Sequence, residues 1–577
     1  MKRNFILSVL LAVGLAALLA GCWGSSKSTS VTVGGGGTAA TATNVGIDVC
    51  NNCHSATAQN GVGIFDAWKT GRHGNDNNSP AYSLASSCAA CHDPQGDGIL
   101  LTNISGFTST RPVIGCEACH GGGSEHYGVG PIGGPKAGYY AVAATTGQSS
   151  QYNTCTSCHQ DSSPYHGTES WNYITDTHFD NGARAVNTTI QGYVIRKALN
   201  TACTDCHNPH SAGLTENLQW AASAHGEFGG EGWKHYDWKL SSRRDCQRCH
   251  TTTGFVNYIT NQSTYNAANN VFVATDNQSE MLYCYGCHQL GSGGFLVARR
   301  AVDNAYLPSG PGVNDTTTIT GLGSSELCIN CHSGREPGSQ VKSNLAASAT
   351  GPDNTSFGSF NSHYLLAGAT LFQDNTFSAS DNQFTGPGAY QFVGNNYATP
   401  TAFTHDTIGG STQGPCVGCH MTSPNVTGNN TTGKHSFLPF TYTSGAVDNI
   451  TSTQCASCHG VTTSALSVVG INASRTTYAT RIAELKTALE SQGIYYNSAA
   501  YPYFYSDNTW ASSKQLKTWA TKAGTLGIST EDLVGVAFNL NYFTHEPGAY
   551  AHNDIYTYRV LYDSIIKIGG TPSFGRP

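Results

Sequence analysis

The chain has 577 residues, a formal net charge of −7 and only 11% charged residues. Typical soluble domains carry about 25% charged residues, and a nucleic-acid-binding protein would show a surplus of Lys and Arg, so this composition excludes that class. The polar residues are mainly Gly, Ser, Thr and Asn, which favour turns and loops, so we expect little regular structure.

The amino terminus has the pattern of an export signal. Lys2 and Arg3 precede an apolar run from Phe5 to Ala20, which is too short to span a bilayer comfortably. The run ends in Leu-Ala-Gly-Cys, which is similar to a bacterial lipobox. We therefore expect a lipoprotein signal peptide over residues 1–21 and a lipid on Cys22. The alternative is an ordinary cleavage site beside an accidental cysteine.

Residues 22–48 are rich in Gly, Ser and Thr and predict a flexible linker. No later segment has the pattern of a transmembrane helix, so membrane contact is predicted through lipid on Cys22.

Twenty of the 21 cysteines fall in ten copies of Cys-x-x-Cys-His. The copies are Cys50/Cys53/His54, Cys88/Cys91/His92, Cys116/Cys119/His120, Cys155/Cys158/His159, Cys203/Cys206/His207, Cys246/Cys249/His250, Cys284/Cys287/His288, Cys328/Cys331/His332, Cys416/Cys419/His420 and Cys455/Cys458/His459. This is the attachment signature of c-type haem, in which two thiols bond the macrocycle and the histidine ligates the iron. A disulfide framework, zinc sites or a thioredoxin-like pair would not explain a histidine after every pair. The sequence thus predicts ten covalently bound haem c groups.

Each iron needs a second axial ligand, and twelve further histidines are available. His210 illustrates the pattern, because Pro209 directs it away from the haem that His207 would ligate and toward a neighbouring one. The predicted distal ligands are His73, His126, His178, His210, His225, His235, His363, His405, His435 and His552, which leaves His166 and His545 over. With only three methionines in the chain, bis-histidine ligation and low reduction potentials are expected throughout.

Other residues are expected to surround the haems. Plausible propionate partners are Arg243, Arg244, Arg248, Arg299, Arg300 and Arg335, although any of them could be merely solvated. Trp220, Trp233 and Trp238 are expected to pack on haems and not to carry charge.

Two regions do not follow the regular spacing of the Cys-x-x-Cys-His motifs. The interval 333–415 is either an excursion that delivers ligands or a small surface subdomain. The tail after His459 has helical stripes: Tyr478, Ile482, Leu485 and Leu489, ending before Gly493, and Leu516, Trp519, Ala520 and Ala523, ending at Gly524. Thr530 is predicted to cap a helix through Leu533 to Leu540, and Asn553 to cap a last helix with Tyr558, Leu561, Tyr562 and Ile565.

The predicted fold class is a multihaem cytochrome c, with mostly irregular loops and short helices around a haem core. A decahaem electron-transfer region spans residues 49–460, and a small helical C-terminal cap spans residues 461–577. Haem faces are expected to supply much of the apolar interior, with no room for a separate large core between the motifs.

The chain resembles the outer-membrane multihaem (decahaem) c-type cytochrome lipoproteins of dissimilatory metal-reducing bacteria. The similarity runs from about residue 176 to residue 566 and is carried by Asp176-Thr177-His178-Phe179-Asp180, the segment 206–212, Gln219-Trp220 with His225, the segment 246–251, Gly334-Arg335-Glu336, the segment 414–421 and the segment 547–553. The resemblance implies distal ligation by His178, His210, His225, His363, His435 and His552. It also implies a lipid-anchored protein of the outer membrane that faces the cell exterior. As partners it implies other multihaem cytochromes and an outer-membrane porin, with extracellular metal oxides or chelates as electron acceptors.

The expected function is therefore electron conduction along a chain of haems to Fe(III) minerals or a partner cytochrome, without substrate conversion. Two alternatives stay open. A catalytic multihaem enzyme would need one open iron position, and a filament subunit would use a surplus histidine to ligate a haem in the next copy.

Overall fold

The structure is a computed structural model. It describes residues 47–55, 64–71, 73–74, 114–117, 207, 215–227, 230–236, 238, 240–260, 262–270, 281–290, 296–299, 304–305, 318–347, 353, 360–373, 377–380, 382–424, 433–460 and 466–577. The predicted signal peptide and the linker up to residue 46 lie outside the described residues. So do His126, His166, His178, His210 and Arg300.

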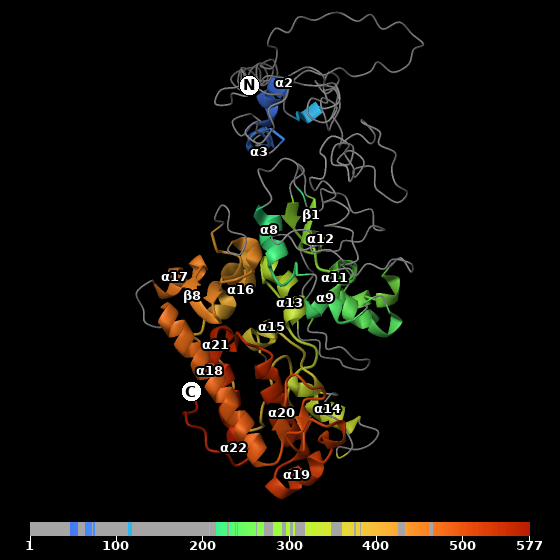
Figure 1. Ribbon diagram of the computed structural model, residues 1–577, viewed down its shortest axis with the longest axis vertical. Coiled ribbons are helices and arrows are strands. Elements are labelled where there is room, and N and C mark those ends of the chain that lie inside the picture. Colours follow the sequence, from blue (N-terminus) through green and yellow to red (C-terminus); the bar gives the residue numbers. More distant parts are fainter. Residues whose placement is uncertain are drawn as a thin grey trace, which may run out of the picture.

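Short helices connected by loops make up the described chain as far as the motif at Cys455 (Figure 1). The α-helices are α2 (Ile47–His54), α3 (Ile64–Thr70), α8 (Thr215–Ala222), α9 (Glu231–Lys234), α10 (Gln247–His250), α11 (Thr252–Thr260), α12 (Cys284–Cys287), α13 (Glu326–His332), α14 (Val341–Ala346), α15 (Ala367–Leu371), α16 (Gly410–His420) and α17 (Thr453–His459). The 3-10 turns are η4 (Ser241–Cys246), η5 (Gln262–Thr264), η6 (Ala267–Asn269), η7 (Gly323–Ser325), η8 (Gly338–Gln340), η11 (His405–Thr407), η12 (Lys434–Ser436) and η13 (Ser512–Lys514).

The strands are equally short. Within the described residues they form five separate antiparallel pairs: β1 (His288–Leu290) with β2 (Leu296–Ala298), β3 (Asn304–Ala305) with β4 (Thr318–Ile319), β5 (Phe377–Ser378) with β6 (Gln383–Phe384), β7 (Phe440–Thr443) with β8 (Ala446–Ile450), and β9 (Tyr495–Tyr496) with β10 (Phe504–Tyr505). Two-stranded pairs of this length are not stable alone, so each depends on its surroundings.

The C-terminal part consists of longer helices that pack on one another: α18 (Val468–Ser491), α19 (Trp519–Leu526), α20 (Thr530–Thr544), α21 (Ala549–His552) and α22 (Asp554–Lys567). Helices α18, α20 and α22 lie side by side (Figure 1). Every residue of α20 from Leu533 to Phe543 is buried, so this helix passes through the middle of the core.

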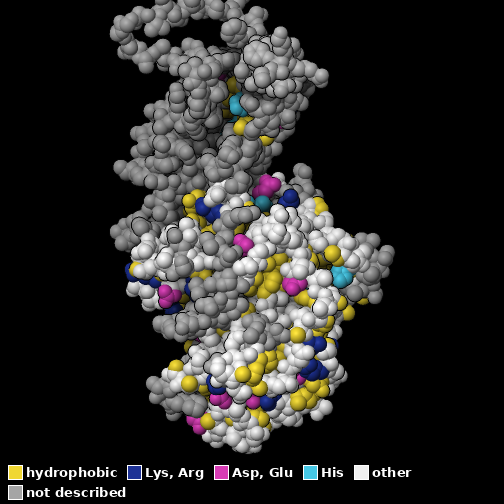
Figure 2. Space-filling model, turned by 180° about the vertical axis from the view of Figure 1, so that it is seen from behind, with side chains coloured by type: hydrophobic (Ala, Val, Ile, Leu, Met, Phe, Trp, Pro, Cys, Tyr) yellow, Lys and Arg dark blue, Asp and Glu magenta, His cyan; other side chains and the backbone are white. Residues whose placement is uncertain are grey.

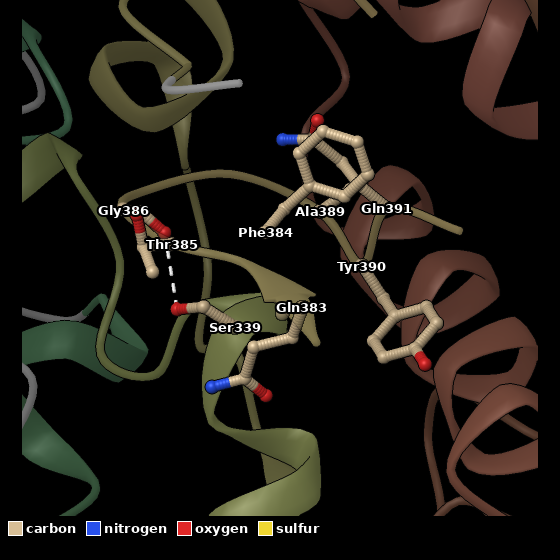
Figure 3. Close-up of a pocket in the computed structure, with 9 residues that line it drawn as sticks. Ser339, Gln383, Phe384, Thr385, Gly386, Ala389, Tyr390 and Gln391 are labelled. Atoms are coloured by element: carbon tan, nitrogen blue, oxygen red, sulfur yellow. Dashed lines mark hydrogen bonds between the residues drawn. The ribbon is translucent and has the colours of Figure 1, made fainter. Parts of the chain in front are cut away.

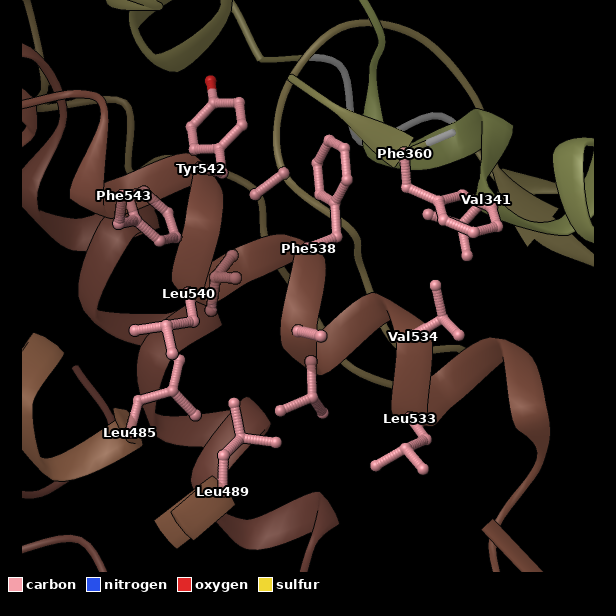
Figure 4. Packing of buried hydrophobic residues seen from close by; sticks show 14 of the residues in the cluster. Val341, Phe360, Leu485, Leu489, Leu533, Val534, Phe538, Leu540, Tyr542 and Phe543 are labelled. Carbon is pink, nitrogen blue, oxygen red and sulfur yellow. The ribbon is translucent and has the colours of Figure 1, made fainter. Parts of the chain in front are cut away.

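The hydrophobic core joins this helical part to the 341–397 segment. Leu485, Leu533 and Phe538 pack in the same cluster as Val341 and Phe360 (Figure 4). Haem faces were expected to supply much of the apolar interior of the motif region, with no room there for a separate large core; residues 341–397 depart from that expectation. The physical reason is that the 333–415 interval contributes aromatic and aliphatic side chains to a core shared with the tail.

The four predicted helices of the tail are present, with two corrections at their ends. The first stripe lies on α18, which ends at Ser491, and Asn553 caps α22 by accepting from Tyr556 N at 3.1 Å. The second helix does not end at Gly524 but at Leu526, where Gly527 adopts a left-handed φ of 68°. Ser529, not Thr530, caps α20, because its hydroxyl accepts from Asp532 N at 3.0 Å.

Candidate functional site

Five complete Cys-x-x-Cys-His motifs lie within the described residues, and each is carried by a helical turn. They occupy α10 with the last residue of η4, α12 with the first residue of β1, α13, α16 and α17. A helical turn places residues i and i+3 on one face, so the two thiols of a motif point the same way. All of their cysteines are free of disulfides.

The other five predicted motifs fall wholly or partly outside the described residues. The first motif lies on α2, where Cys50 and His54 are described, whereas nothing is described of the Cys53 side chain. Of the third and fifth motifs, only Cys116 and His207 are described. The motif residues that lie outside the described residues are Cys88, Cys91, His92, Cys119, His120, Cys155, Cys158, His159, Cys203 and Cys206. Haem attachment at these five motifs therefore stays a prediction from the sequence.

The helix α16 depends on a glycine two residues before its motif. Gly414 has a φ of 68° and interrupts the helix beside Pro415. A Cβ at Gly414 would lie 2.1 Å from the Leu322 carbonyl oxygen, so only glycine allows this close approach between α16 and η7.

The ring of each of the five fully described motif histidines faces one histidine from elsewhere in the chain. The pairs and their centroid separations are His250 with His363 (6.0 Å), His288 with His435 (5.9 Å), His332 with His225 (6.2 Å), His420 with His552 (6.2 Å) and His459 with His405 (6.0 Å). The five opposing residues are all among the histidines that the sequence nominates as distal ligands.

The separation fits two imidazoles bound to opposite sides of one metal ion. With metal–nitrogen bonds of about 2.0 Å and a ring radius of about 1.1 Å, the two centroids would lie about 6.2 Å apart. The measured range of 5.9–6.2 Å matches this value in every pair. The donor set of two thiols and two imidazoles therefore fits haem c.

Backbone carbonyls hold several of these rings in place. His250 Nδ1 lies 2.8 Å from Gly232 O, His420 Nδ1 lies 2.9 Å from Phe437 O, and His405 Nδ1 lies 2.8 Å from Ala551 O. A carbonyl requires a proton on Nδ1, which leaves the Nε2 lone pair available for a metal.

His552 differs from the other paired histidines because its Nδ1 partner is a carboxylate. Glu546 Oε1 lies 2.8 Å away, and the Glu546 side chain is only 2% exposed. Burial acts to lower the pKa of His552, but the Glu546 carboxylate outweighs it and raises that pKa above its usual value. Sequence reasoning had no cause to single out Glu546. The one available signal was its position six residues before a candidate ligand.

Burial keeps most of the other paired rings neutral. Burial, together with the smaller effect of a neighbouring histidine, lowers the pKa of His225, His363, His420 and His435 to about 4. Neutral imidazole is the form that binds metal, so these rings need not lose a proton before ligation.

The remaining described histidines have other surroundings. His235 has an exposed side chain with Nδ1 3.0 Å from Glu231 Oε2, and the His73 carbonyl accepts from Ile114 N at 3.0 Å. His545 is buried beside Tyr364, with ring centroids 4.3 Å apart, and neither of its ring nitrogens has a hydrogen-bond partner among the described residues.

The predicted aromatic and arginine neighbours also have described positions. Trp238 stacks on His250 with centroids 4.1 Å apart, Trp233 lies edge-on to the same ring, and Trp220 is buried in α8. Arg243, Arg248 and Arg299 each lie over a tyrosine ring. On the face shown in Figure 2, charged side chains of both signs are scattered among hydrophobic ones.

A small hollow lies apart from the paired histidines, between η8 and the strand β6. Ser339 donates to Gly386 O across it at 3.1 Å (Figure 3). Its lining is Gly338, Ser339, Gln383, Phe384, Thr385, Gly386, Ala389, Tyr390 and Gln391. This lining contains no cysteine or histidine, so the hollow is not part of the motif cluster.

Among the helices that the structure describes, none combines the length and the apolar character needed to cross a bilayer.

Comparison with known proteins places these motifs in a family. Residues 227–297 match a family model described as C-type polyheme cytochrome domain 2. The chain is 31% identical to the C-type polyheme cytochrome OmcB of Geobacter sulfurreducens, over 89% of this chain and 80% of that protein. It is 30% identical to the C-type polyheme cytochrome OmcC of the same species, over 97% of this chain and 94% of that protein. No solved structure matches. The chain thus belongs to the C-type polyheme cytochromes, proteins with covalently bound haem c that transfer electrons.

Proposed function

We propose that this cytochrome is a decahaem electron conductor in which every iron is ligated by two histidines. The observation that supports this most strongly is the set of five opposing histidine pairs, each 5.9–6.2 Å apart. Bound haem c would supply one-electron redox chemistry at each motif. At the five fully described motifs, the residues proposed to hold haem are the thiols from Cys246 to Cys458 and these ten histidines.

The polypeptide's part in this function is to fix the rings and to keep the potentials low. Backbone carbonyls orient His250, His405 and His420, and a carboxylate orients His552. If haem is bound as proposed, the two imidazoles of a pair would both ligate its iron and leave no position for a substrate, which argues against the enzyme alternative. The other five motifs are proposed to take His73, His126, His178, His210 and His235 as their distal ligands.

We further propose that the protein is anchored in the outer membrane through lipid on Cys22 and faces the cell exterior. Its proposed partners are other multihaem cytochromes and a porin, and its proposed acceptors are extracellular metal oxides or chelates. The lipobox-like Leu19-Ala20-Gly21-Cys22 sequence and the resemblance to metal-reducing bacterial cytochromes support this placement.

Ligation is tested with purified holoprotein. The ferrous protein is expected to bind no carbon monoxide, and the ferric protein is expected to show only low-spin haem at neutral pH. Ten haems per chain are expected from intact mass. Stoichiometric carbon monoxide binding would indicate an open iron position and would overturn the conductor proposal in favour of an enzyme.

Orientation is tested by protease treatment of intact cells. Loss of the haem-stained band is expected for a protein that faces the exterior. Full protection of the band would contradict that placement without affecting the proposed ligation.

A further inference from the structure

Three short segments of the chain each serve two histidine pairs at once. Each segment supplies one histidine to a pair and a backbone group that hydrogen-bonds a histidine of a different pair. We call these the bridging segments; they are residues 363–365, 435–437 and 551–552.

The bridging segment 551–552 is the most direct of the three. His552 faces His420, while the carbonyl of the preceding residue, Ala551, accepts from His405 Nδ1 at 2.8 Å. The carbonyl carbon of Ala551 is bonded to the amide nitrogen of His552. One peptide bond and one hydrogen bond therefore separate the backbone of His552 from the ring of His405.

The bridging segment 435–437 has the same design with one more residue. His435 faces His288, and the Phe437 carbonyl oxygen lies 2.9 Å from His420 Nδ1. The Phe437 ring also lies edge-on to His225, with centroids 4.8 Å apart. Phe437 has a φ of 59°, a left-handed conformation that few non-glycine residues adopt, so its carbonyl direction is set by the fold.

The bridging segment 363–365 repeats the arrangement a third time. His363 faces His250, and the backbone of Leu365 is hydrogen-bonded to the ring of His332. Both His363 and Leu365 have left-handed φ values, of 74° and 57°. The Leu365 amide donates to His545 O at 2.9 Å, so this segment is fixed to the end of α20.

We propose that each bridging segment couples the reduction potentials of the two haem sites it joins, so that the sites of His250 and His332, of His288 and His420, and of His420 and His459 titrate as interacting pairs. This inference rests on the proposed bis-histidine ligation. With haem bound as proposed, reduction of one site would make the Nδ1 proton of its histidine less acidic and so alter the hydrogen bond from that ring to the carbonyl. Because that carbonyl is part of the segment holding another iron's ligand, the change reaches the second site.

The order of coupling differs from the order of motifs along the chain. The site of His288 follows that of His250 in sequence, but its bridging segment joins it to the site of His420. The site of His420 is therefore the one described site that two bridging segments reach, and it is expected to influence two others.

A double-variant cycle on the holoprotein tests this coupling. The coupled cycle comprises His405→Met, His552→Met and the double variant, since these histidines belong to pairs joined by residues 551–552. The matched control comprises His405→Met, His435→Met and their double variant, whose pairs share no bridging segment among the described residues. Midpoint potentials are measured by spectroelectrochemical titration, and electron paramagnetic resonance counts the bis-histidine signals that each single variant loses.

The expected result is that the shifts in midpoint potential are non-additive in the coupled cycle and additive in the control cycle. Additive shifts in both cycles, with one bis-histidine signal lost in each single variant, would overturn the coupling and leave the proposed function intact. Single variants that lose no such signal would overturn the ligation itself and this inference with it. A second cycle with His225→Met and His363→Met is also expected to give non-additive shifts in midpoint potential. Its outcome does not depend on whether the variants of the first cycle fold.

Discussion

The carboxylate at His552 offers the most direct test of how the polypeptide sets a potential. Glu546 Oε1 lies 2.8 Å from His552 Nδ1, whereas His250, His405 and His420 make the equivalent contact with a neutral carbonyl. The substitution Glu546→Gln keeps the shape and a hydrogen-bonding oxygen but removes the negative charge. The proposed haem site of His420 and His552 is then expected to be easier to reduce.

The size of the effect follows from Coulomb's law. Glu546 Oε1 lies 2.8 Å from His552 Nδ1, and the ring centroids of His420 and His552 are 6.2 Å apart, so the midpoint between the rings is at most about 7 Å from that oxygen. At an effective dielectric constant of about 20, a unit charge at about 7 Å contributes about 2 kcal/mol. For a one-electron couple this free energy corresponds to a shift of about 100 mV. The sign is positive, because the carboxylate stabilises the ferric state more than the ferrous state.

The assay is a spectroelectrochemical titration of the purified holoprotein. In Glu546→Gln, the midpoint potential of one haem is expected to be higher by about 100 mV. The matched control is Glu490→Gln on α18, where the side chain is 35% exposed and water screens the charge. No shift in the Glu546 variant, or a shift equal to that of the control, would show that this carboxylate does not act on the proposed site.

Three further predictions concern the ring planes, a buried acid and the core. Three histidine pairs have nearly perpendicular ring planes (82°, 79° and 78°), and two have ring planes at 41° and 38°. We therefore expect two classes of low-spin electron paramagnetic resonance signal, with larger anisotropy where the planes are perpendicular. A single class of signal would contradict the proposed pairing. Burial raises the pKa of Glu336 from 4.5 to about 7, against the opposing effect of Arg335, so the folded protein binds more protons than the unfolded chain in this window and loses stability as the pH rises through 7. Glu336→Gln is therefore expected to exceed the parent in stability by about 3 kcal/mol at pH 8 and to match it near pH 4, as measured by denaturant unfolding; equal gains at both pH values would refute the assignment. Leu485→Ala removes a fully buried side chain and is expected to lower the free energy of unfolding by about 3 kcal/mol in the same assay, with no change in the haem spectrum. A change in the spectrum would show that the core and the haem sites are not separable.

Sequence periodicity predicted the helices of the tail because their apolar faces repeat at helical spacing. Tyr478, Leu485 and Leu489 are buried along α18, as that pattern requires. The helix ends were less predictable, since Ser529 and Thr530 are both good capping residues and only the three-dimensional backbone shows which hydroxyl reaches an amide. The wrong end of α19 has a similar origin, because Gly524 is tolerated inside the helix while Gly527 adopts the left-handed turn.

For the site, counting histidines nominated the five residues that face the described motif histidines but could not pair them. The members of each pair lie more than fifty residues apart in the chain, and no local pattern encodes such distant contacts. Sequence reasoning also missed Glu546, because a single carboxylate is informative only once its distance to a ring is known. The contribution of residues 341–397 to the core was missed for the same reason, since their apolar side chains are scattered through loop-like sequence.

The apolar core and the paired histidines meet at His552, and this meeting explains how a loop-rich chain can hold a ring accurately. Tyr478, buried on α18, donates its hydroxyl to Phe543 O at 2.7 Å and to Glu546 O at 2.9 Å, so the core fixes the backbone that carries the carboxylate. A Cβ at Gly548 would lie 2.5 Å from His552 Cε1, which shows that the ring rests directly on this backbone. The ring is thus confined by packing on one side and by a buried charge on the other. The backbone against which this ring packs is thus held by a conventional protein core.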